Sequence, residues 1–157
     1  MKFKYLFFDF DSVMHGEEFN SGFFSHADMV TDRLLPYKDN FKIVISSSWR
    51  EEHDLDVLQH AFNEPLNLNV IGVTPITTNG MNYHGRYLEI KEYCKIHNVA
   101  DDQWLAIDDL ARLFPQNCPQ LVLTNSSTGI TPKVLDQIEE FVSTPYIPKK
   151  QNHKKIK

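Results

Sequence analysis

Residues 4–13, KYLFFDFDSV, place two acids two positions apart at the end of an apolar run. Alternate side chains of a β-strand point to the same face, so a strand over Tyr5–Phe10 brings the carboxylates of Asp9 and Asp11 close together. Like charges at that range repel by an energy on the order of several kcal/mol unless a cation or a shared proton lies between them. The pair therefore predicts a cation site, and a strand that ends in a solvated turn is the alternative.

The length and the cysteine content indicate one intracellular domain. The chain has 157 residues, of which 41% are hydrophobic, and this is enough to bury a core. Cys94 and Cys118 are far apart and match neither a disulfide framework nor a Cys-x-x-Cys motif. No stretch approaches the roughly 20 apolar residues that cross a bilayer, and no cleavage site follows the first apolar run. We therefore expect a cytoplasmic protein without membrane contact.

The charge is unevenly distributed along the chain. The net charge is −5, yet residues 145–157 hold five lysines and no acid. An acidic body argues against broad coating of nucleic acid, whereas the basic tail is either a phosphate-binding arm or a solubilising end. We expect a single folded domain over residues 1–144 and a basic, disordered tail over residues 145–157.

Five short apolar runs predict the strands of a parallel sheet. They are uniformly apolar rather than alternating, as in strands that are buried on both faces. Helical patterns lie between them, and the clearest has Thr131 as its cap and Pro132 at its first position. The predicted strands are 5–10, 42–46, 68–73, 104–107 and 120–123, and the predicted helices are 26–35, 51–62, 86–97 and 131–142. This order predicts an α/β fold, a three-layer, Rossmann-like open parallel sheet of about five strands.

Three of the predicted strands end in polar residues that suit metal and phosphate chemistry. The first ends in Asp9 and Asp11, the second in Ser46–Ser48, and the fourth in Asp108 and Asp109. Ligands of open α/β sheets bind beyond the carboxyl ends of the strands, so these side chains are expected to converge. Four carboxylates form an all-oxygen site of the kind that Mg²⁺ prefers, with positions left for water and phosphate oxygens. All four are predicted metal ligands.

These motifs resemble the haloacid dehalogenase (HAD) superfamily. Its members carry a strand ending in D-x-D-x-[TV], a strand ending in Ser or Thr, a Lys or Arg, and a strand ending in an acidic pair. In this chain the corresponding segments are FFDFDSV, IVISSS, a basic residue near HGRYLEIK, and AIDD. SSSWR, the R-x-x-E-I of Arg86–Ile90, IDD and LVLTNSSTGIT further resemble the small branch found as a domain in Swiss Army Knife RNA repair proteins. The resemblance covers residues 3–143 and departs from most members at Ser12, which stands where they have Gly.

The resemblance implies a phosphatase that works through an aspartyl phosphate. Asp9 would be the nucleophile, and Asp11 would protonate the leaving oxygen and then activate the hydrolytic water. Arg86 is the expected basic residue, because it precedes a helix and so faces the same edge as the strand ends. Lys91, within that helix, is the alternative.

Other residues beside the motifs have two interpretations each. Either Ser46 or Ser47 would bind the phosphate, and their spacing does not decide between them. Asp109 would complete the metal shell through water or orient Asp108, whereas a helix-capping acid is the alternative. Trp49 offers a face on which a base could stack, or it packs under the start of a helix.

The segments between the motifs leave no room for a cap domain. Only 34 residues separate Asp11 from Ser46 and 38 separate Ser47 from Arg86, and a helix with its connections accounts for each segment. An open site suits a large or protruding substrate, such as a phosphorylated nucleic-acid end. We therefore expect a Mg²⁺-dependent phosphomonoester hydrolase with no stable protein partner. A small-nucleotide phosphatase and a non-catalytic phosphate-binding module are the alternatives.

Overall fold

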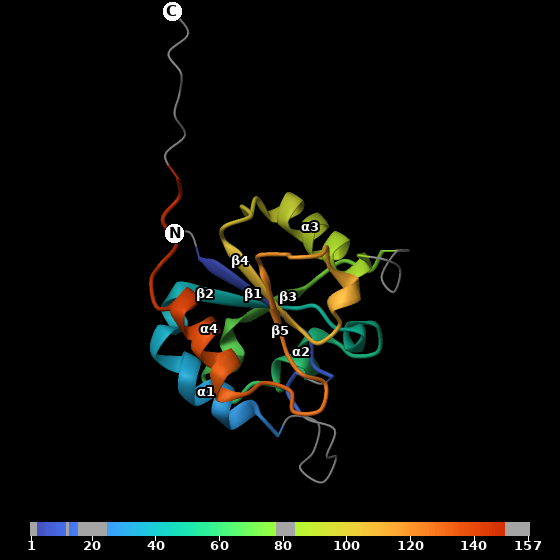
Figure 1. Cartoon of the computed structure of the whole chain (residues 1–157). Helices are drawn as coiled ribbons and strands as arrows, with labels where there is room; N and C mark the ends of the chain where they lie inside the picture. Colours follow the sequence, from blue (N-terminus) through green and yellow to red (C-terminus); the bar gives the residue numbers. More distant parts are fainter. Residues whose placement is uncertain (1–2, 12, 16–24, 78–83, 150–157) are drawn as a thin grey trace, which may run out of the picture.

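The chain folds around a five-stranded parallel sheet with the strand order β3-β2-β1-β4-β5 (Figure 1). The computed structural model describes residues 3–11, 13–15, 25–77 and 84–149. The strands are β1 (Lys4–Phe8), β2 (Phe41–Ile45), β3 (Val70–Val73), β4 (Trp104–Asp108) and β5 (Leu121–Leu123). The α-helices are α1 (Ala27–Leu34), α2 (Leu55–Gln59), α3 (Gly85–His97) and α4 (Pro132–Val142), and the 3₁₀ helices are η2 (Leu35–Asn40), η3 (Ser48–Glu51), η4 (Leu66–Asn69) and η5 (Ala111–Leu113). The predicted α/β architecture is confirmed, and the described residues form no cap.

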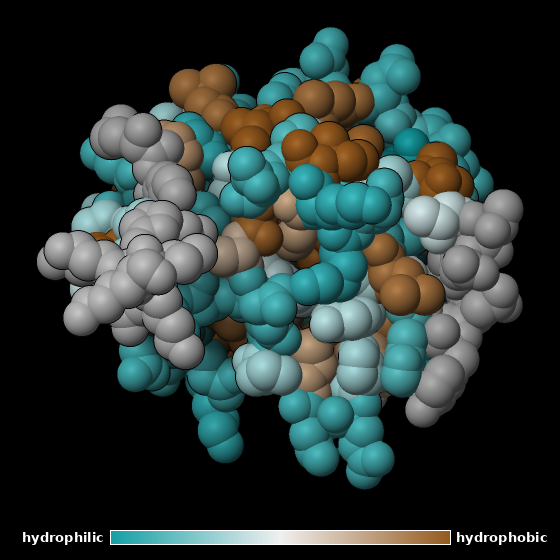
Figure 2. Space-filling view, turned by 90° about the horizontal axis from the view of Figure 1, so that it is seen from above, coloured by the Kyte–Doolittle hydropathy of each residue, from teal (hydrophilic) through white to brown (hydrophobic). Residues whose placement is uncertain are grey.

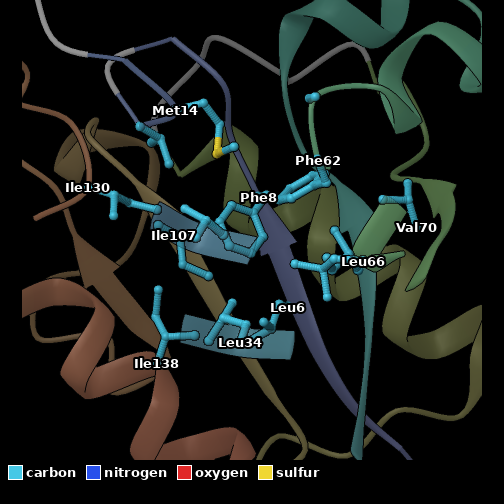
Figure 3. Packing of buried hydrophobic residues seen from close by; sticks show 14 of the residues in the cluster. Leu6, Phe8, Met14, Leu34, Phe62, Leu66, Val70, Ile107, Ile130 and Ile138 are labelled. Atoms are coloured by element: carbon cyan, nitrogen blue, oxygen red, sulfur yellow. The ribbon is translucent and has the colours of Figure 1, made fainter. Parts of the chain in front are cut away.

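Helices cover both faces of the sheet and make three layers. On one face, helices α1 and α4 pack against Leu6 and Phe8 of the central strand, as Leu34 and Ile138 show in Figure 3. On the other face, α3 packs over the alternate side chains of the strands, which point away from α1 and α4. There Phe7 contacts Tyr93 edge to face, with 5.4 Å between the ring centroids. Figure 1 shows α3 as the outer layer on this side, and Figure 2, seen from above, shows hydrophilic residues interspersed with hydrophobic patches there.

Some predicted elements differ in extent from the observed ones. The predicted strand over residues 5–10 ends at Phe8, because the backbone N–H groups of Val13 and Met14 donate to Phe10 O and turn the chain out of the sheet. The predicted helix over 51–62 is reduced to α2, with Asp54 as its N-cap, and Glu51 instead ends η3. The predicted third strand begins later, at Val70, because residues 66–69 form η4. Asp9 and Asp11 therefore do not lie on one strand, and the alternation of strand side chains does not bring their carboxylates together.

A loop after β5 holds the segment that follows β1. Ile130 N donates to Val13 O at 2.8 Å, and His26 Nε2 donates to Thr128 O at 2.7 Å. Gly129 has a φ of 67°, and a Cβ atom there would come within 2.5 Å of His15 O. Only glycine fits this contact, so the TNSSTGIT segment fixes the course of the chain just beyond Asp11.

The described part of the chain contains no helix that is long and apolar enough to cross a membrane. Residues 145–149, the first part of the predicted tail, form neither helix nor strand, and Tyr146 Oη donates to Asp102 Oδ1 at 2.8 Å. The remaining tail, residues 150–157, and Ser12 lie outside the described residues. The domain boundary at residue 144 stays a prediction.

Candidate active site

The carboxyl ends of β1, β2 and β4 bring Asp9, Ser46 and Asp108 to one edge of the sheet. Asp9 N donates to Ile107 O at 3.0 Å, and Ser46 N donates to Phe8 O at 2.8 Å, so the ladders continue one residue past the paired strands. Each of the three polar residues comes two positions after a side chain buried beneath α3, namely Phe7, Val44 and Ala106. Side chains two apart share a face, so the three lie on the side of the sheet that α3 covers.

Three carboxylates form a group that fits a divalent cation. Asp9, Asp108 and Asp109 each offer an oxygen atom, and these oxygens all lie within 4.8 Å of one another. Asp9 is 5% exposed and Asp108 1% exposed, so the charges are withdrawn from water. Hard oxygen ligands of this kind suit Mg²⁺. Asp11 is not a member of this group, and its assignment as a fourth ligand stays a prediction.

Arg86, in the first turn of α3, lies between two of these carboxylates. Its Nη1 atom is 3.3 Å from Asp9 Oδ1 and 3.1 Å from Asp108 Oδ2, and it also donates to Ser46 O. The side chain is buried with them. Lys91, the alternative basic residue, instead pairs with Asp101, which precedes β4 at its other end. The structure therefore places Arg86 in the site and Lys91 outside it.

Burial and neighbouring negative charge raise the pKa values of two of these carboxylates, Asp9 and Asp108. Burial and then the charge of Asp108 raise the pKa of Asp9 well above its usual range, although Arg86 opposes the shift. Burial also raises the pKa of Asp108 to about 6, again against the effect of Arg86. For Arg86, burial alone would lower the pKa, but Asp108 and Asp9 outweigh it and the pKa rises. The single positive charge of Arg86 does not balance the negative charges of these carboxylates. A bound cation would compensate the remaining negative charge.

The two candidate serines differ in what their hydroxyls do. Ser47 Oγ accepts a hydrogen bond from Trp49 N at 3.3 Å and so caps η3. Ser46 Oγ is buried and has no hydrogen-bond partner among the described residues. A buried hydroxyl without a partner costs free energy, which a phosphate oxygen could recover. This favours Ser46 as the phosphate ligand, a choice that the sequence left open.

Asp109 does not act as a helix cap. The short helix η5 begins after Leu110 and has no side-chain cap. The neighbouring Asp108 instead accepts from Leu110 N through Oδ1, at 2.9 Å, which fixes the turn after β4. The position of Asp109 beside Asp9 and Asp108 is consistent with the predicted role at a metal.

Asp11 lies in the turn after β1, beside Trp49. Its Oδ2 atom accepts from Trp49 Nε1 at 3.0 Å, and its Oδ1 atom is 3.4 Å from His15 Nε2. The Trp49 ring packs edge to face on Phe10, 6.0 Å between centroids, and is half-buried against the core. Trp49 thus lies within η3 and packs on the turn after β1, rather than under the start of a helix, and its role in stacking on a base stays a prediction.

A buried ion pair that the sequence analysis did not assign supports the site. Arg50 Nη2 lies 2.6 Å from Glu89 Oε2, and Arg50 also donates to the carbonyl oxygens of Ser47 and Thr74. Glu89 accepts from Thr77 N at 3.0 Å. The pair joins the segments after β2 and β3 to α3. The two residues lie 39 positions apart, so no spacing in the sequence signals their pairing.

Comparison with known families agrees with this geometry. The family model described as the HAD domain in Swiss Army Knife RNA repair proteins matches residues 5–135, which include every residue of the site. A search of curated proteins found no match. The matched segment covers most of the 157 residues and confirms the resemblance that the motifs suggested. The chain belongs to the family of HAD domains of Swiss Army Knife RNA repair proteins.

Proposed function

We propose that the protein is a Mg²⁺-dependent phosphatase that hydrolyses phosphomonoesters through an aspartyl phosphate on Asp9. The observation that carries the proposal is the burial of Asp9 beside Arg86, Asp108 and Asp109 at the carboxyl edge of the sheet. The HAD superfamily consists mostly of phosphatases and related hydrolases, and this supports the same reaction class.

The residues of the site have complementary roles in this reaction. An oxygen of Asp9 attacks phosphorus while the bond from phosphorus to the leaving oxygen breaks, and Asp11 gives its proton to that oxygen. Asp11 then takes a proton from a water molecule, whose oxygen attacks the phosphoryl group and releases inorganic phosphate and free Asp9. Arg86 and the Ser46 hydroxyl donate to phosphoryl oxygens. A Mg²⁺ ion held by Asp9, Asp108 and Asp109 would neutralise charge on the phosphoryl group.

Mg²⁺ should stabilise the fold in a pH-dependent way. The pKa of Asp108 is raised to about 6 in the folded protein. The metal-free protein should therefore lose stability as the pH rises from the pKa of Asp108 in the unfolded chain to above about 6. Mg²⁺ requires the ionised carboxylate, so saturating Mg²⁺ should raise Tm by about 3–8 °C near pH 7.5 and much less near pH 5. Thermal denaturation followed by circular dichroism, with Mg²⁺ or with EDTA, measures both effects.

Asp108→Asn should abolish the Mg²⁺-dependent rise in Tm, because it removes one of the three carboxylates. Asp56→Asn, a change of the same kind at an exposed position of α2, should keep it. A rise that survives in Asp108→Asn would place the ion elsewhere.

For the substrate, we propose phosphorylated nucleic-acid ends. The family is named for RNA repair proteins, and no described element forms a cap over the carboxyl edge. The five lysines of residues 149–157 could add electrostatic affinity for a long, anionic substrate. The kcat/KM for 3′- or 5′-phosphorylated oligonucleotides should therefore exceed that for the matching mononucleotides by roughly tenfold or more, and the excess should fall with added salt.

The control for this comparison is a variant that lacks residues 149–157. It should lose the preference for oligonucleotides and retain its rate on 4-nitrophenyl phosphate. Equal kcat/KM values for oligonucleotides and mononucleotides in the full chain would favour the small-nucleotide phosphatase instead.

A further inference from the structure

The proposed proton donor, Asp11, is held by a side chain from a different strand connection. Trp49 lies in η3, directly after β2, and its indole Nε1 donates to Asp11 Oδ2 at 3.0 Å. We propose that Trp49 is a positioning residue that orients the Asp11 carboxylate toward the leaving oxygen of the substrate. This inference rests on the phosphatase function proposed above, and it assigns a role to a residue outside the group that binds metal and phosphate.

The indole itself is fixed from several sides. Its ring packs edge to face on Phe10, the fully buried residue between the two aspartates, and a second ring, His53, lies 5.4 Å away in a tilted arrangement. The backbone N–H of Trp49 donates to Ser47 Oγ at 3.3 Å. A ring held by such contacts has little freedom, so its N–H group has a defined direction. Asp11 thereby receives a rigid partner, although it lies in a turn.

The two oxygens of Asp11 are not equivalent in this arrangement. An indole N–H can only donate, so Oδ2 is retained as an acceptor. Oδ1 makes only a longer contact, at 3.4 Å to His15 Nε2, so it is held less tightly than Oδ2. The Asp11 side chain is 55% exposed, so a substrate can approach it. Oδ1 is therefore the oxygen that carries the proton to the leaving group.

A positioning role differs from a packing role in its dependence on the leaving group. The alkoxide of an alkyl phosphate is a strong base, and it leaves only if the proton of Asp11 is transferred as the phosphorus–oxygen bond breaks. A nitrophenolate is a weak base and leaves without that proton. Loss of the indole N–H should thus slow the first reaction and spare the second, whereas a disturbed fold would slow both.

The test compares kcat/KM for propyl phosphate and 4-nitrophenyl phosphate, in the presence of Mg²⁺, for the full chain and for Trp49→Phe. The kcat/KM value reports the steps up to the first irreversible one, which is the transfer of the phosphoryl group to Asp9. Neither compound carries a nucleobase, but the nitrophenyl ring can stack on an aromatic side chain, so the comparison also needs a variant that keeps the two-ring surface of Trp49. The ratio of the propyl to the nitrophenyl value should fall about tenfold in Trp49→Phe, the effect of one lost hydrogen bond to a charged group.

Two further variants complete the experiment. Replacement of Trp49 by benzothienylalanine keeps the shape of the ring system without the N–H group, and it should lower the ratio equally even if Trp49→Phe folds poorly. Trp104→Phe removes the other indole N–H, which is buried at the start of β4 and has no partner among the described residues, and it should leave the ratio unchanged. An unchanged ratio in the benzothienylalanine protein overturns the role of Trp49. A wild-type chain that hydrolyses neither phosphate overturns the phosphatase proposal itself, and this inference with it.

Discussion

Asp9→Asn is expected to lower kcat for 4-nitrophenyl phosphate by at least about 10³-fold, since an amide cannot form the acyl phosphate. The variant should nevertheless fold. Burial and Asp108 already raise the pKa of Asp9, so removal of its charge relieves repulsion in the metal-free site. We therefore expect a Tm equal to or above that of the wild type in EDTA. Steady-state kinetics in Mg²⁺ and thermal denaturation measure the two quantities.

Asp56→Asn is the matched control for this result, because it makes the same change at an exposed position of α2. It should keep the wild-type kcat. A kcat for Asp9→Asn within tenfold of the wild type would show that Asp9 is not the nucleophile. Binding of inorganic phosphate by an inert wild-type chain would instead support the non-catalytic module.

Arg86→Met is expected to lower the free energy of unfolding by about 3–5 kcal/mol, because it leaves the carboxylates of Asp9 and Asp108 buried beside each other without their common partner. The loss should be largest above about pH 6, where Asp108 is ionised in the wild type, and smaller at lower pH. Urea denaturation at the two pH values measures it. The loss of a donor to the phosphoryl group should also lower kcat by about 10²-fold or more.

Lys91→Met is the control, since Lys91 also lies in α3 and also pairs with an aspartate, but at the surface. Such exposed pairs contribute about 0–1 kcal/mol, and kcat should be unaffected. Arg86→Lys keeps a charge near the carboxylates and should fold even if Arg86→Met does not, with an intermediate kcat. Equal losses of stability in the Arg86 and Lys91 variants would contradict the central position of Arg86.

The fold was accessible from the sequence because it depends on local patterns. Five short apolar runs separated by helical patterns are typical of the strands of a parallel sheet, and Thr131 with Pro132 marks the start of α4. The convergence of Asp9 and Asp108 followed from the rule that parallel strands end at a common edge. Local patterns failed over residues 48–69, where η3 precedes a helix shorter than expected and η4 takes the place of the first residues of the expected strand. Short 3₁₀ segments depend on turn geometry, and hydrophobic periodicity does not record it.

Much of the site depended on contacts between distant segments. The preference for Ser46 over Ser47 follows from the use of the Ser47 hydroxyl as the cap of η3. The pairing of Arg50 with Glu89 joins residues 39 positions apart, and each alone reads as an ordinary surface charge. Asp11 lies outside the strand because hydrogen bonds to Phe10 O form a turn there. These features arise only when the strands have brought their connections together, so no spacing in the sequence encodes them directly.

The identity of the nucleophile is tested most directly by chemical trapping of the intermediate. Phosphate-labelled substrate is mixed with the full chain and Mg²⁺, the reaction is stopped with acid during turnover, and the labelled peptide is mapped. We expect a hydroxylamine-sensitive acyl phosphate on Asp9 that is absent from Asp9→Asn. Label on another residue, or continued turnover with no labelled protein at any time, would contradict the proposed mechanism.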